Sequence, residues 1–382
     1  MSQLKVNTIR HTGASSDAVT LATDGTCTAK ITNNLSNRNL IINGAVTISQ
    51  RLGTSNTTIG SGATYGPDRI AARTQTGSGH TLAQTADGPA GFKYSAKVTI
   101  GTGGSPSAAN KNYLYQTIEG NNVAHLGSGT SSAETVTLSF WVKSSLTGNF
   151  GAAIVSGAAD HSYTFPYTIS SANTWEKKTK TIALPTSGGT WATDNSGGLM
   201  VMFDLGSGSD FEGTANQWNS AFDVRASSDV KLMATNSATW YVTGLQLEVG
   251  HATDFEHRSY GDELARSQRY FYMHLNPSEG GPSANYMPVC TAYFDSTTQA
   301  YGIINFPVTM NHYPDLYKVQ GTNYFDLRID GTSDLCDEVL LNRSTPTSAT
   351  IYFTGNVSGT AGKGTMMRSN NSAARIGFDA EL

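Results

Sequence analysis

The sequence predicts an all-β protein: a jelly-roll sandwich followed by a short connector helix and a smaller C-terminal β domain. Two observations support this fold class. Only 14% of the 382 residues are charged, while the chain holds 40 glycines and abundant Ser, Thr and Asn, which favour turns and strands over helices. Strand-like runs also recur along the chain with turn-rich gaps between them, as is typical of sandwiches and jelly rolls.

The composition also excludes several classes of protein. A net charge of −4 and the absence of a Lys/Arg block argue against a nucleic-acid partner. The 17 Tyr, 14 Phe and 5 Trp argue against disorder, and no apolar stretch is long enough for membrane insertion. Cys27, Cys290 and Cys336 are scattered, and the N-terminus has no apolar signal region, so we expect synthesis in a reducing cytoplasm.

Residues 1–37 read as an N-terminal arm. Short alternating pieces, such as Leu4, Val6 and Thr8, are separated by Gly and Ser. They are too few to bury a core of their own. We expect the arm to gain its partners from another chain; the alternative is disorder.

Residues 38–256 are predicted to form the jelly roll. "NLIINGAVTIS" pairs two runs across Asn43-Gly44, a strong hairpin or turn signal. In "WYVTGLQLEV", the alternation places Tyr241, Thr243, Leu245, Leu247 and Val249 on one face, with Gln246 and Glu248 on a wetted face. The charged run "EKKTK" at 176–180 reads as the solvated face of a strand. The other predicted strands are "FKYSAKVTI", "YLYQTIE", "TVTLSFWVK", "WEKKTKTIAL" and "LMVMFDL".

Residues 257–272 are predicted to form the connector helix. Ser259 is placed to cap it, Asp262 stands at the third helical position, and Arg266 and Arg269 come late. Residues 273–382 then return to β composition, in runs such as "MPVCTAYFD", "AYGIINFPVTM" and "ATIYFTG". They are sufficient for a second, smaller β domain.

The sequence offers few residues with the spacing of a catalytic or metal site. It contains no nucleophile elbow and no phosphate-binding glycine loop. Asp204, Asp210 and Glu212 surround a Gly-rich loop and are a weak candidate Ca²⁺ site, since hard oxygen ligands in a loop suit that ion. The alternatives are a carboxylate pair for glycoside hydrolysis and simple exposed turn acids. A second metal possibility is the patch His251, Asp254, Glu256 and His257, whose spacing matches no standard site.

The five tryptophans divide into two groups. Trp141 and Trp240 lie within predicted strands, which indicates core positions, and Trp175 opens a strand, which indicates a structural role. Trp191 and Trp218 lie in polar loops, where an indole can stack on the C–H face of a sugar while amides and carboxylates bind its hydroxyls. Trp191 and Trp218, with Asp194, are therefore the predicted glycan-binding residues; the alternative is that both rings fold back over the edge of the sandwich.

Several stretches together resemble tail-fibre or virion structural proteins of marine tailed bacteriophages, with a carbohydrate-binding-module-like jelly roll. The resemblance covers most of residues 38–272, in order, with a fainter similarity near the C-terminus. Such domains usually carry an aromatic residue where Ile70 stands and often a Cys where Ser267 stands. The stretches are "NLIINGAVTISQR", "YGPDRIAAR", "LSFWVK", "WYVTGLQLEVG", "FEHRSYGDELARSQRYF" and "GFDAEL".

The resemblance implies a homotrimeric, non-enzymatic tail-fibre subunit without cofactor. The arm would dock to other virion tail proteins, and the distal domains would bind host-surface glycan. Leu264 and Phe271 are then the expected trimer-interface residues on the connector helix. The alternatives are a polysaccharide depolymerase of the tailspike kind, a capsid-decorating head fibre and a free bacterial carbohydrate-binding protein.

Overall fold

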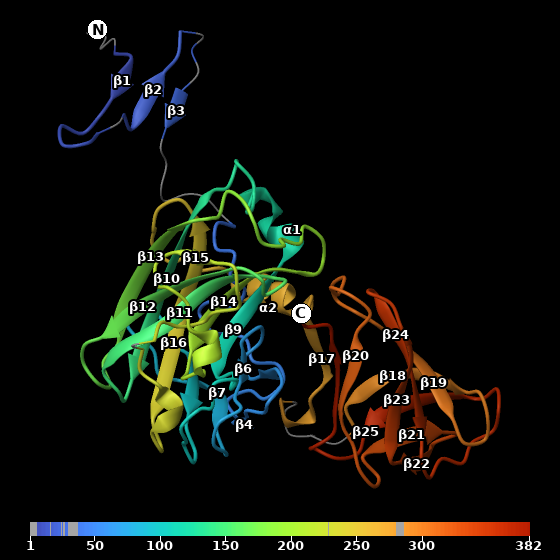
Figure 1. The fold of residues 1–382 in the computed structure, drawn as a ribbon. Helices are drawn as coiled ribbons and strands as arrows, with labels where there is room; N and C mark the ends of the chain where they lie inside the picture. Colours follow the sequence, from blue (N-terminus) through green and yellow to red (C-terminus); the bar gives the residue numbers. More distant parts are fainter. Residues whose placement is uncertain are drawn as a thin grey trace.

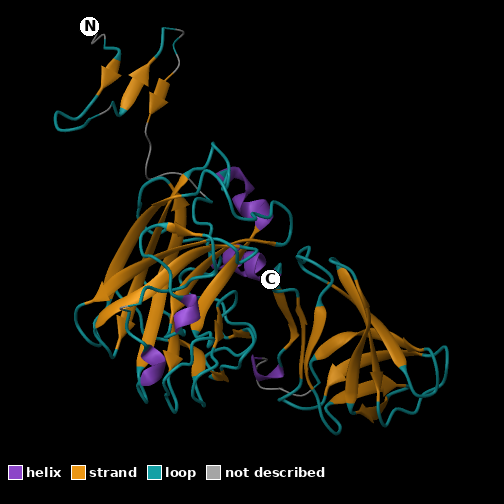
Figure 2. Cartoon of the chain, viewed as in Figure 1, coloured by secondary structure: helices purple, strands orange, loops and turns teal. Residues whose placement is uncertain are grey.

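The computed structural model describes residues 6–15, 17–23, 25, 27–29, 37–227, 229–279 and 286–382. In chain order they form a small N-terminal sheet, a two-sheet sandwich and a C-terminal β domain (Figure 1). Strands dominate, and the helices are few and short (Figure 2). The predicted all-β fold class, a jelly-roll sandwich with a smaller β domain after it, is confirmed. The exact domain boundaries stay predictions.

The N-terminal sheet contains three short antiparallel strands, β1 (Thr8–Ile9), β2 (Val19–Leu21) and β3 (Cys27–Ala29). Figure 1 shows it apart from the sandwich. Its apolar side chains are open to solvent, since Val6, Ile9 and Leu21 are 37%, 55% and 41% exposed. Leu4, with the rest of residues 1–5, 16, 24, 26 and 30–36 of the predicted arm, lies outside the described residues.

The sandwich has two sheets, which we name by one strand of each. The β10 sheet has the order β13-β10-β16-β8-β7-β4, and the β11 sheet has the order β15-β12-β11-β14-β9-β6-β5. The chain crosses between the sheets at β4–β5, β6–β7, β8–β9, β9–β10, β10–β11, β12–β13, β13–β14 and β15–β16, as a jelly roll requires. The bounds are β4 (Thr57–Thr58), β5 (Thr64–Tyr65), β6 (Ala71–Arg73), β7 (Thr81–Thr85), β8 (Ser95–Thr99), β9 (Tyr113–Glu119), β10 (Thr135–Ser144), β11 (Gly148–Ser156), β12 (Ser162–Ile169), β13 (Glu176–Ala183), β14 (Gly197–Asp204), β15 (Trp218–Asn219) and β16 (Thr239–Val249).

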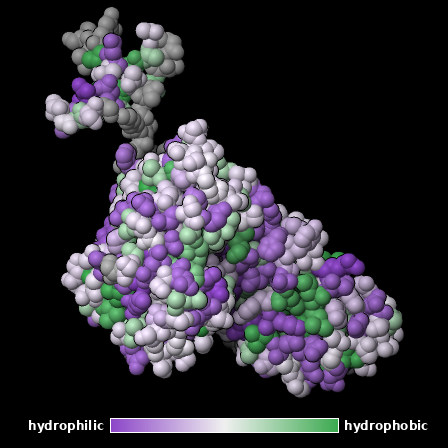
Figure 3. Space-filling model, viewed as in Figure 1, coloured by the Kyte–Doolittle hydropathy of each residue, from purple (hydrophilic) through white to green (hydrophobic). Residues whose placement is uncertain are grey.

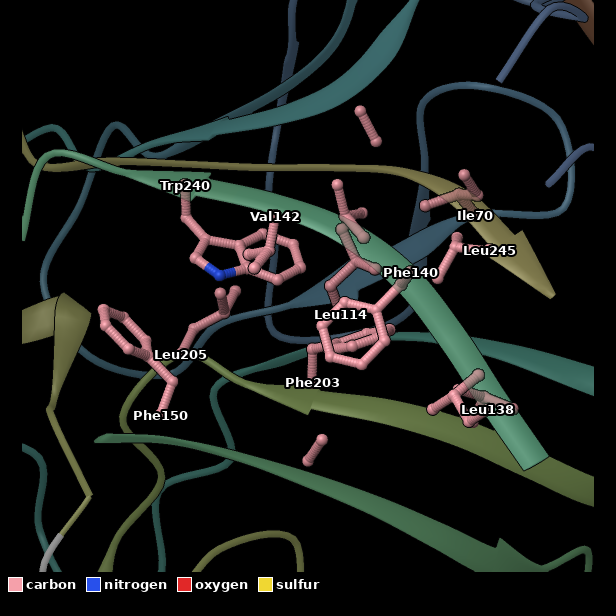
Figure 4. Packing of buried hydrophobic residues seen from close by; sticks show 14 of the residues in the cluster. Ile70, Leu114, Leu138, Phe140, Val142, Phe150, Phe203, Leu205, Trp240 and Leu245 are labelled. Carbon is pink, nitrogen blue, oxygen red and sulfur yellow. The ribbon is translucent and has the colours of Figure 1, made fainter. Parts of the chain in front are cut away.

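The core between these sheets is built from inward-facing residues of both (Figure 4). Phe140 of β10 contacts Phe203 of β14 with ring centres 4.9 Å apart, and Phe203 contacts Trp240 at 5.4 Å. The buried Trp240 indole donates a hydrogen bond to the Tyr167 hydroxyl at 3.1 Å. Trp240 is therefore a core residue as predicted. Ile70, where an aromatic residue is usual in the resembling proteins, is also buried in this core.

Strand β16 departs from the predicted alternation. Trp240 and Val242 face the core in its first half, whereas Leu245 and Leu247 face it in the second half. The switch occurs at Gly244, whose φ of +61° accommodates a bulge, and the pairing with β10 shifts register at the same level.

The bulge also affects the neighbouring faces. Trp141 of β10 lies half-exposed on the outer face beside Gly244, so its expected core position is wrong. Gln246 and Glu248 are buried rather than wetted, because Thr253 in the following loop donates two hydrogen bonds to the Glu248 carboxylate.

The segment around Asn43-Gly44 is a buried turn and not a hairpin. Asn43 has a φ of +60° and its carbonyl accepts a hydrogen bond from the Val46 amide, but no strand forms on either side. The Asn43 side chain instead bonds both the amide and the carbonyl of Ile48. A Cβ at Gly44 would lie 2.2 Å from the Leu245 carbonyl oxygen, so the segment packs tightly against β16.

The predicted connector helix is α2 (Tyr260–Gln268). The Ser259 hydroxyl accepts the Asp262 amide at 3.2 Å, which confirms the predicted cap. Its buried residues are Glu263 and Ser267, and Glu263 accepts a hydrogen bond from the Asn43 amide, so the helix packs on the sandwich. The remaining helices are α1 (Gly120–Val123), η1 (Ala124–Leu126), η2 (Ser209–Phe211), η3 (Leu232–Ala234) and η4 (Pro277–Glu279).

The C-terminal domain packs a three-stranded sheet, β17-β26-β20, against a seven-stranded sheet, β22-β21-β25-β18-β19-β24-β23. Ile376 and Phe378 of the small sheet and Phe294, Phe325 and Phe353 of the large sheet share one core. The bounds are β17 (Phe271–Leu275), β18 (Pro288–Phe294), β19 (Ala300–Asn305), β20 (Asp315–Val319), β21 (Phe325–Ile329), β22 (Thr332–Cys336), β23 (Glu338–Ser344), β24 (Ser348–Thr354), β25 (Gly364–Ser369) and β26 (Arg375–Asp379).

The end of the chain returns to the sandwich through an ionic cluster, which we define as Arg51, Arg69, Asp379 and Glu381. Glu381 accepts hydrogen bonds from Arg51 at 3.2 Å and from Arg69, and Arg51 also bonds Asp379 at 2.9 Å. The side chains of Arg51, Arg69 and Glu381 are at most 5% exposed. Buried charges of opposite sign therefore join the two domains.

The visible surface is mostly hydrophilic or neutral, and hydrophobic residues gather on the C-terminal domain (Figure 3). In the part of the chain that the structure describes, no helix is both long and apolar enough to cross a membrane.

Candidate functional site

The structure brings the two predicted loop tryptophans together at the rim of the sandwich. The rings of Trp191 and Trp218 meet edge to face with centres 5.7 Å apart. Trp218 also contacts Tyr163 at 5.6 Å and stacks on His161 at 6.4 Å, with 26° between the planes. We call His161, Tyr163, Trp191 and Trp218 the rim cluster.

The rim cluster is anchored on the sandwich core. The Trp191 indole donates to the Gly188 carbonyl at 3.0 Å, and the Trp218 indole donates to the Ala183 carbonyl at 2.9 Å. Gly189, at φ +74°, allows this close packing, since a Cβ there would lie 2.7 Å from the Trp191 indole nitrogen. Both rings are half-buried against the core. The fold-back anticipated as the alternative therefore occurs, yet part of each ring stays exposed.

Asp160, which the sequence analysis missed, supplies a carboxylate beside Trp191. Its Oδ1 accepts hydrogen bonds from the Ser156 hydroxyl at 2.7 Å and from the Thr190 amide at 3.0 Å. These bonds lower the pKa of Asp160 to about 2, so the group is ionised at neutral pH. No short-range signal marked Asp160, because its link to the Trp191 loop spans 30 residues.

Other polar groups lie around the rim cluster. The Lys180 ammonium lies 5.7 Å from the centre of the Tyr163 ring and donates to the Asn216 side-chain oxygen at 2.6 Å. Asp194, the predicted acid, bonds the Ser196 amide at 2.9 Å with its carboxylate, and its carbonyl accepts the Asn121 amide at 2.7 Å. Asp194 thus shapes the turn that packs beside α1, whereas Asp160 is the acid that bonds the backbone next to Trp191.

A second aromatic group lies on the outer face of the β11 sheet and was also missed. Tyr113 and Tyr115 of β9 lie there with Met202 of β14, and Phe211 and Phe222 pack over them from residues 205–229. The Lys111 ammonium lies 5.3 Å and 5.1 Å from the ring centres of Phe211 and Phe222. This loop covers much of the sheet face, so the group is mainly a local core.

Two of the three predicted calcium ligands, Asp204 and Glu212, lie beside a buried arginine. Asp204 is fully buried, accepts the amides of Gly206 and Ser207, and lies 3.8 Å from the Arg225 guanidinium. Glu212 lies 3.4 Å from Arg225, whereas Asp210 is exposed at the start of η2. Among the described residues, no group of three His, Cys, Asp or Glu side chains could hold a metal ion. The positive charge beside Asp204 and Glu212 is therefore the buried Arg225 guanidinium, in place of the predicted Ca²⁺ ion.

In the histidine and acid patch at 251–257, Glu256 and His257 make structural contacts, whereas His251 and Asp254 are exposed. Glu256 accepts the Asn39 amide at 2.8 Å and lies 3.3 Å from the Arg258 guanidinium. The His257 ring packs on Phe92 and Phe255, with centres 5.4 Å and 4.8 Å away.

The expected trimer contact through Phe271 is wrong in this structure. Phe271 is fully buried within the chain, because the Arg51 guanidinium lies 3.6 Å from its ring centre and Tyr317 packs on it at 5.4 Å. Leu264 is half-exposed on α2. Phe271 therefore has no surface to offer a second copy.

Comparison with known proteins assigns this chain to no family. No family model matches the sequence, and no curated protein matches it. Structural neighbours include a putative sugar binding protein from Bacteroides thetaiotaomicron, at 13% identity and a TM-score of 0.31, covering 56% of this chain and 100% of that one. A family 11 carbohydrate-binding module from Clostridium thermocellum has 10% identity and a TM-score of 0.27, covering 53% and 99%.

A phage protein is also among these neighbours. It is the enzymatically active domain of tailspike protein 4 of bacteriophage CBA120, at 13% identity and a TM-score of 0.29, covering 56% of this chain. The match spans only 22% of the length of that protein. All of these values are too low to transfer a ligand or an activity, and the jelly roll described above stands on its own strand order.

Proposed function

We propose that this chain is a non-enzymatic tail-fibre subunit of a bacteriophage, which binds host-surface glycan through the rim cluster. The observation that carries the proposal is the half-buried pair Trp191 and Trp218, with the ionised Asp160 bonded to the Thr190 amide next to Trp191. Sugars present C–H faces that pack on aromatic rings and hydroxyls that donate to carboxylates. Because both indoles are held by backbone carbonyls, little side-chain freedom is lost on binding.

The small N-terminal sheet supports a role in assembly. A sheet with so few residues cannot bury Val6, Ile9 and Leu21 by itself, so these apolar side chains are available to another chain. We propose that this arm docks the subunit to other virion tail proteins and that the subunit is a homotrimer, made in the host cytoplasm. Three weak glycan sites per trimer would then bind with avidity.

Replacing Trp191 by alanine is expected to weaken glycan binding by about tenfold or more, since a stacked aromatic anchor is removed. Binding of the full-length chain would be measured on an array of bacterial surface polysaccharides. The matched control is Trp175→Ala, because Trp175 is a half-buried tryptophan just before β13 that packs on Tyr241 away from the rim cluster. Thermal unfolding of both variants would show that each still folds.

Two results of this experiment would contradict the proposal. Equal glycan binding by the Trp191→Ala chain and the parent would show that the rim cluster does not bind glycan. Release of new reducing ends from the bound polysaccharide would show that the chain is a depolymerase and not a non-enzymatic adhesin. A monomer in light scattering of the full-length chain would count against the homotrimer.

A further inference from the structure

Three tyrosines lie side by side on the outer face of the seven-stranded sheet. Tyr293 of β18 pairs with Tyr301 of β19, which pairs with Tyr352 of β24. The ring centres are 6.4 Å and then 5.1 Å apart, with 30° and 17° between the planes. Their strand neighbours Phe294 and Phe353 are fully buried, so the tyrosines point away from the domain core. We call these three residues the tyrosine row.

The row is closed at one end and open at the other. Leu340 of β23 lies opposite Tyr352, whereas Gly364 of β25 lies opposite Tyr293. A Cβ at Gly364 would meet nothing closer than the Ala292 carbonyl oxygen at 4.0 Å. Gly364 therefore places no side chain beside the last ring, and Tyr293 is 52% exposed.

A groove of about 440 Å³ runs beside the row. Tyr293 and Tyr301 line one side, and Ile303, which is 63% exposed, lines the other. The backbone at Ala292 and Gly302 forms the floor, because their Cα–Cβ directions point to the core. Thr291 and Thr350 add hydroxyl groups at the same surface. A groove of this size is within the range of ligand sites in proteins.

The lining determines what such a groove can bind. It combines aromatic rings, one aliphatic side chain and several hydroxyls, and none of its residues is charged at neutral pH. A charged ligand would lose hydration there without an ionic partner. A sugar ring has apolar faces for the tyrosines and hydroxyls for the threonines and the tyrosine OH groups.

We propose that this groove is a second saccharide-binding site, specific for neutral sugars and located on the C-terminal domain. A sugar ring stacks on Tyr293, whose other side Gly364 leaves uncovered, and the chain continues along the groove toward Ile303. The site shares no residue with the rim cluster. Saccharide binding at the two sites can therefore be tested separately.

The test uses the full-length Trp191→Ala chain on an array of neutral and acidic bacterial glycans, so that rim-cluster binding is weakened. We expect retention of a neutral glycan, with binding reduced about tenfold or more by Tyr293→Ala. Gly364→Leu should reduce the same binding while the fold is kept, because a Cβ there meets no atom closer than 4.0 Å and the leucine would cover the open edge of Tyr293. The control is Tyr313→Ala, since Tyr313 is 68% exposed in the same domain and does not line the groove.

Each other outcome overturns the proposal. If the Trp191→Ala chain binds no neutral glycan, or if Tyr293→Ala and Gly364→Leu bind as well as their parent, the groove is not a saccharide site. If these variants instead lower the mass in light scattering, the groove is an interface between copies of the chain. Loss of binding in Trp191→Ala alone, with no effect at Tyr293, would leave the rim cluster as the glycan site.

Discussion

Replacing Glu381 by glutamine is expected to lower the free energy of unfolding by about 3–5 kcal/mol, although the residue lies next to the C-terminus. Its carboxylate is the shared partner of Arg51 and Arg69, whose side chains are 5% and 2% exposed. Glutamine keeps the shape but removes the charge. Two buried guanidinium groups then lose their main compensation, and burying an uncompensated charge is costly.

The same substitution should uncouple the two domains. All five tryptophans lie between residues 141 and 240, in the sandwich, so their fluorescence reports on that domain alone. Far-ultraviolet circular dichroism reports on the strands of both domains. We expect coincident urea transitions by the two probes in the parent and separate transitions in Glu381→Gln.

Asp379→Asn provides the matched control. Asp379 also bonds Arg51, but its side chain is 33% exposed, so water can replace the interaction. An effect below about 1 kcal/mol is expected there. If Glu381→Gln were as mild as Asp379→Asn and the two transitions stayed coincident, the ionic cluster would not be what joins the domains.

Replacing Arg225 by methionine is expected to lower the free energy of unfolding by about 3–5 kcal/mol and to release Phe211 and Phe222 from the outer face of the β11 sheet. Arg225 is fully buried, and its guanidinium donates to the carbonyls of Ser207 at 3.0 Å and Asp229 at 2.7 Å. It thus ties the two ends of the covering loop to each other. Without it, Phe222 and Tyr113 would separate and expose apolar surface, which increased binding of a hydrophobic dye would detect.

The loss of unfolding free energy in Arg225→Met should depend on pH, because Asp204 lies beside Arg225. Burial raises the pKa of Asp204 to about 6, and the charge of Arg225 opposes that rise. A carboxyl whose pKa is raised on folding contributes stability at low pH, and that contribution is lost as the pH rises through the folded pKa. Removing Arg225 raises the pKa of Asp204 in the folded state further. The stability that protonated Asp204 contributes is then still being lost above about pH 6, whereas in the parent that loss is complete near this pH. The difference in unfolding free energy between parent and Arg225→Met should therefore be larger at pH 8 than at pH 5.

Lys111→Met is the control for this prediction. Lys111 lies over the same two rings, Phe211 and Phe222, but is only partly buried, and replacing it leaves the anchor of the loop intact. It should change stability little and show no pH effect of this kind. A pH-independent cost in Arg225→Met would mean that Asp204 is not coupled to Arg225.

Local sequence predicted the features that depend on near neighbours. The Ser259–Asp262 cap is formed within one turn, and the charged run at 176–180 alternates on edge strand β13 as a solvated face should. The hairpin or turn predicted at Asn43-Gly44 shows the limit of such reasoning. The turn forms, but burial against Leu245, some 200 residues later, prevents the flanking strands.

Two candidate sites show why the rest could not be predicted. Trp191 and Trp218 were recognisable as loop aromatics, but Asp160 joins them only because residues 157–160 and 188–191 meet at the rim. The tyrosine row depends on the register of β18, β19 and β24, in which one slipped residue would turn a ring into the core. The pairing register between these three strands cannot be predicted from the sequence of any one of them.

The sequence by itself determined the all-β class, the order of the sandwich, helix and smaller β domain, and the capped helix, because composition, alternation and capping act over a few residues. The tertiary structure alone decided the bulge at Gly244, the burial of Phe271 under Arg51, and the meeting of Glu381 with Arg69. In each of these cases the partner lies far along the chain. Such contacts follow from how whole sheets pack, and local residue patterns carry little information about that packing.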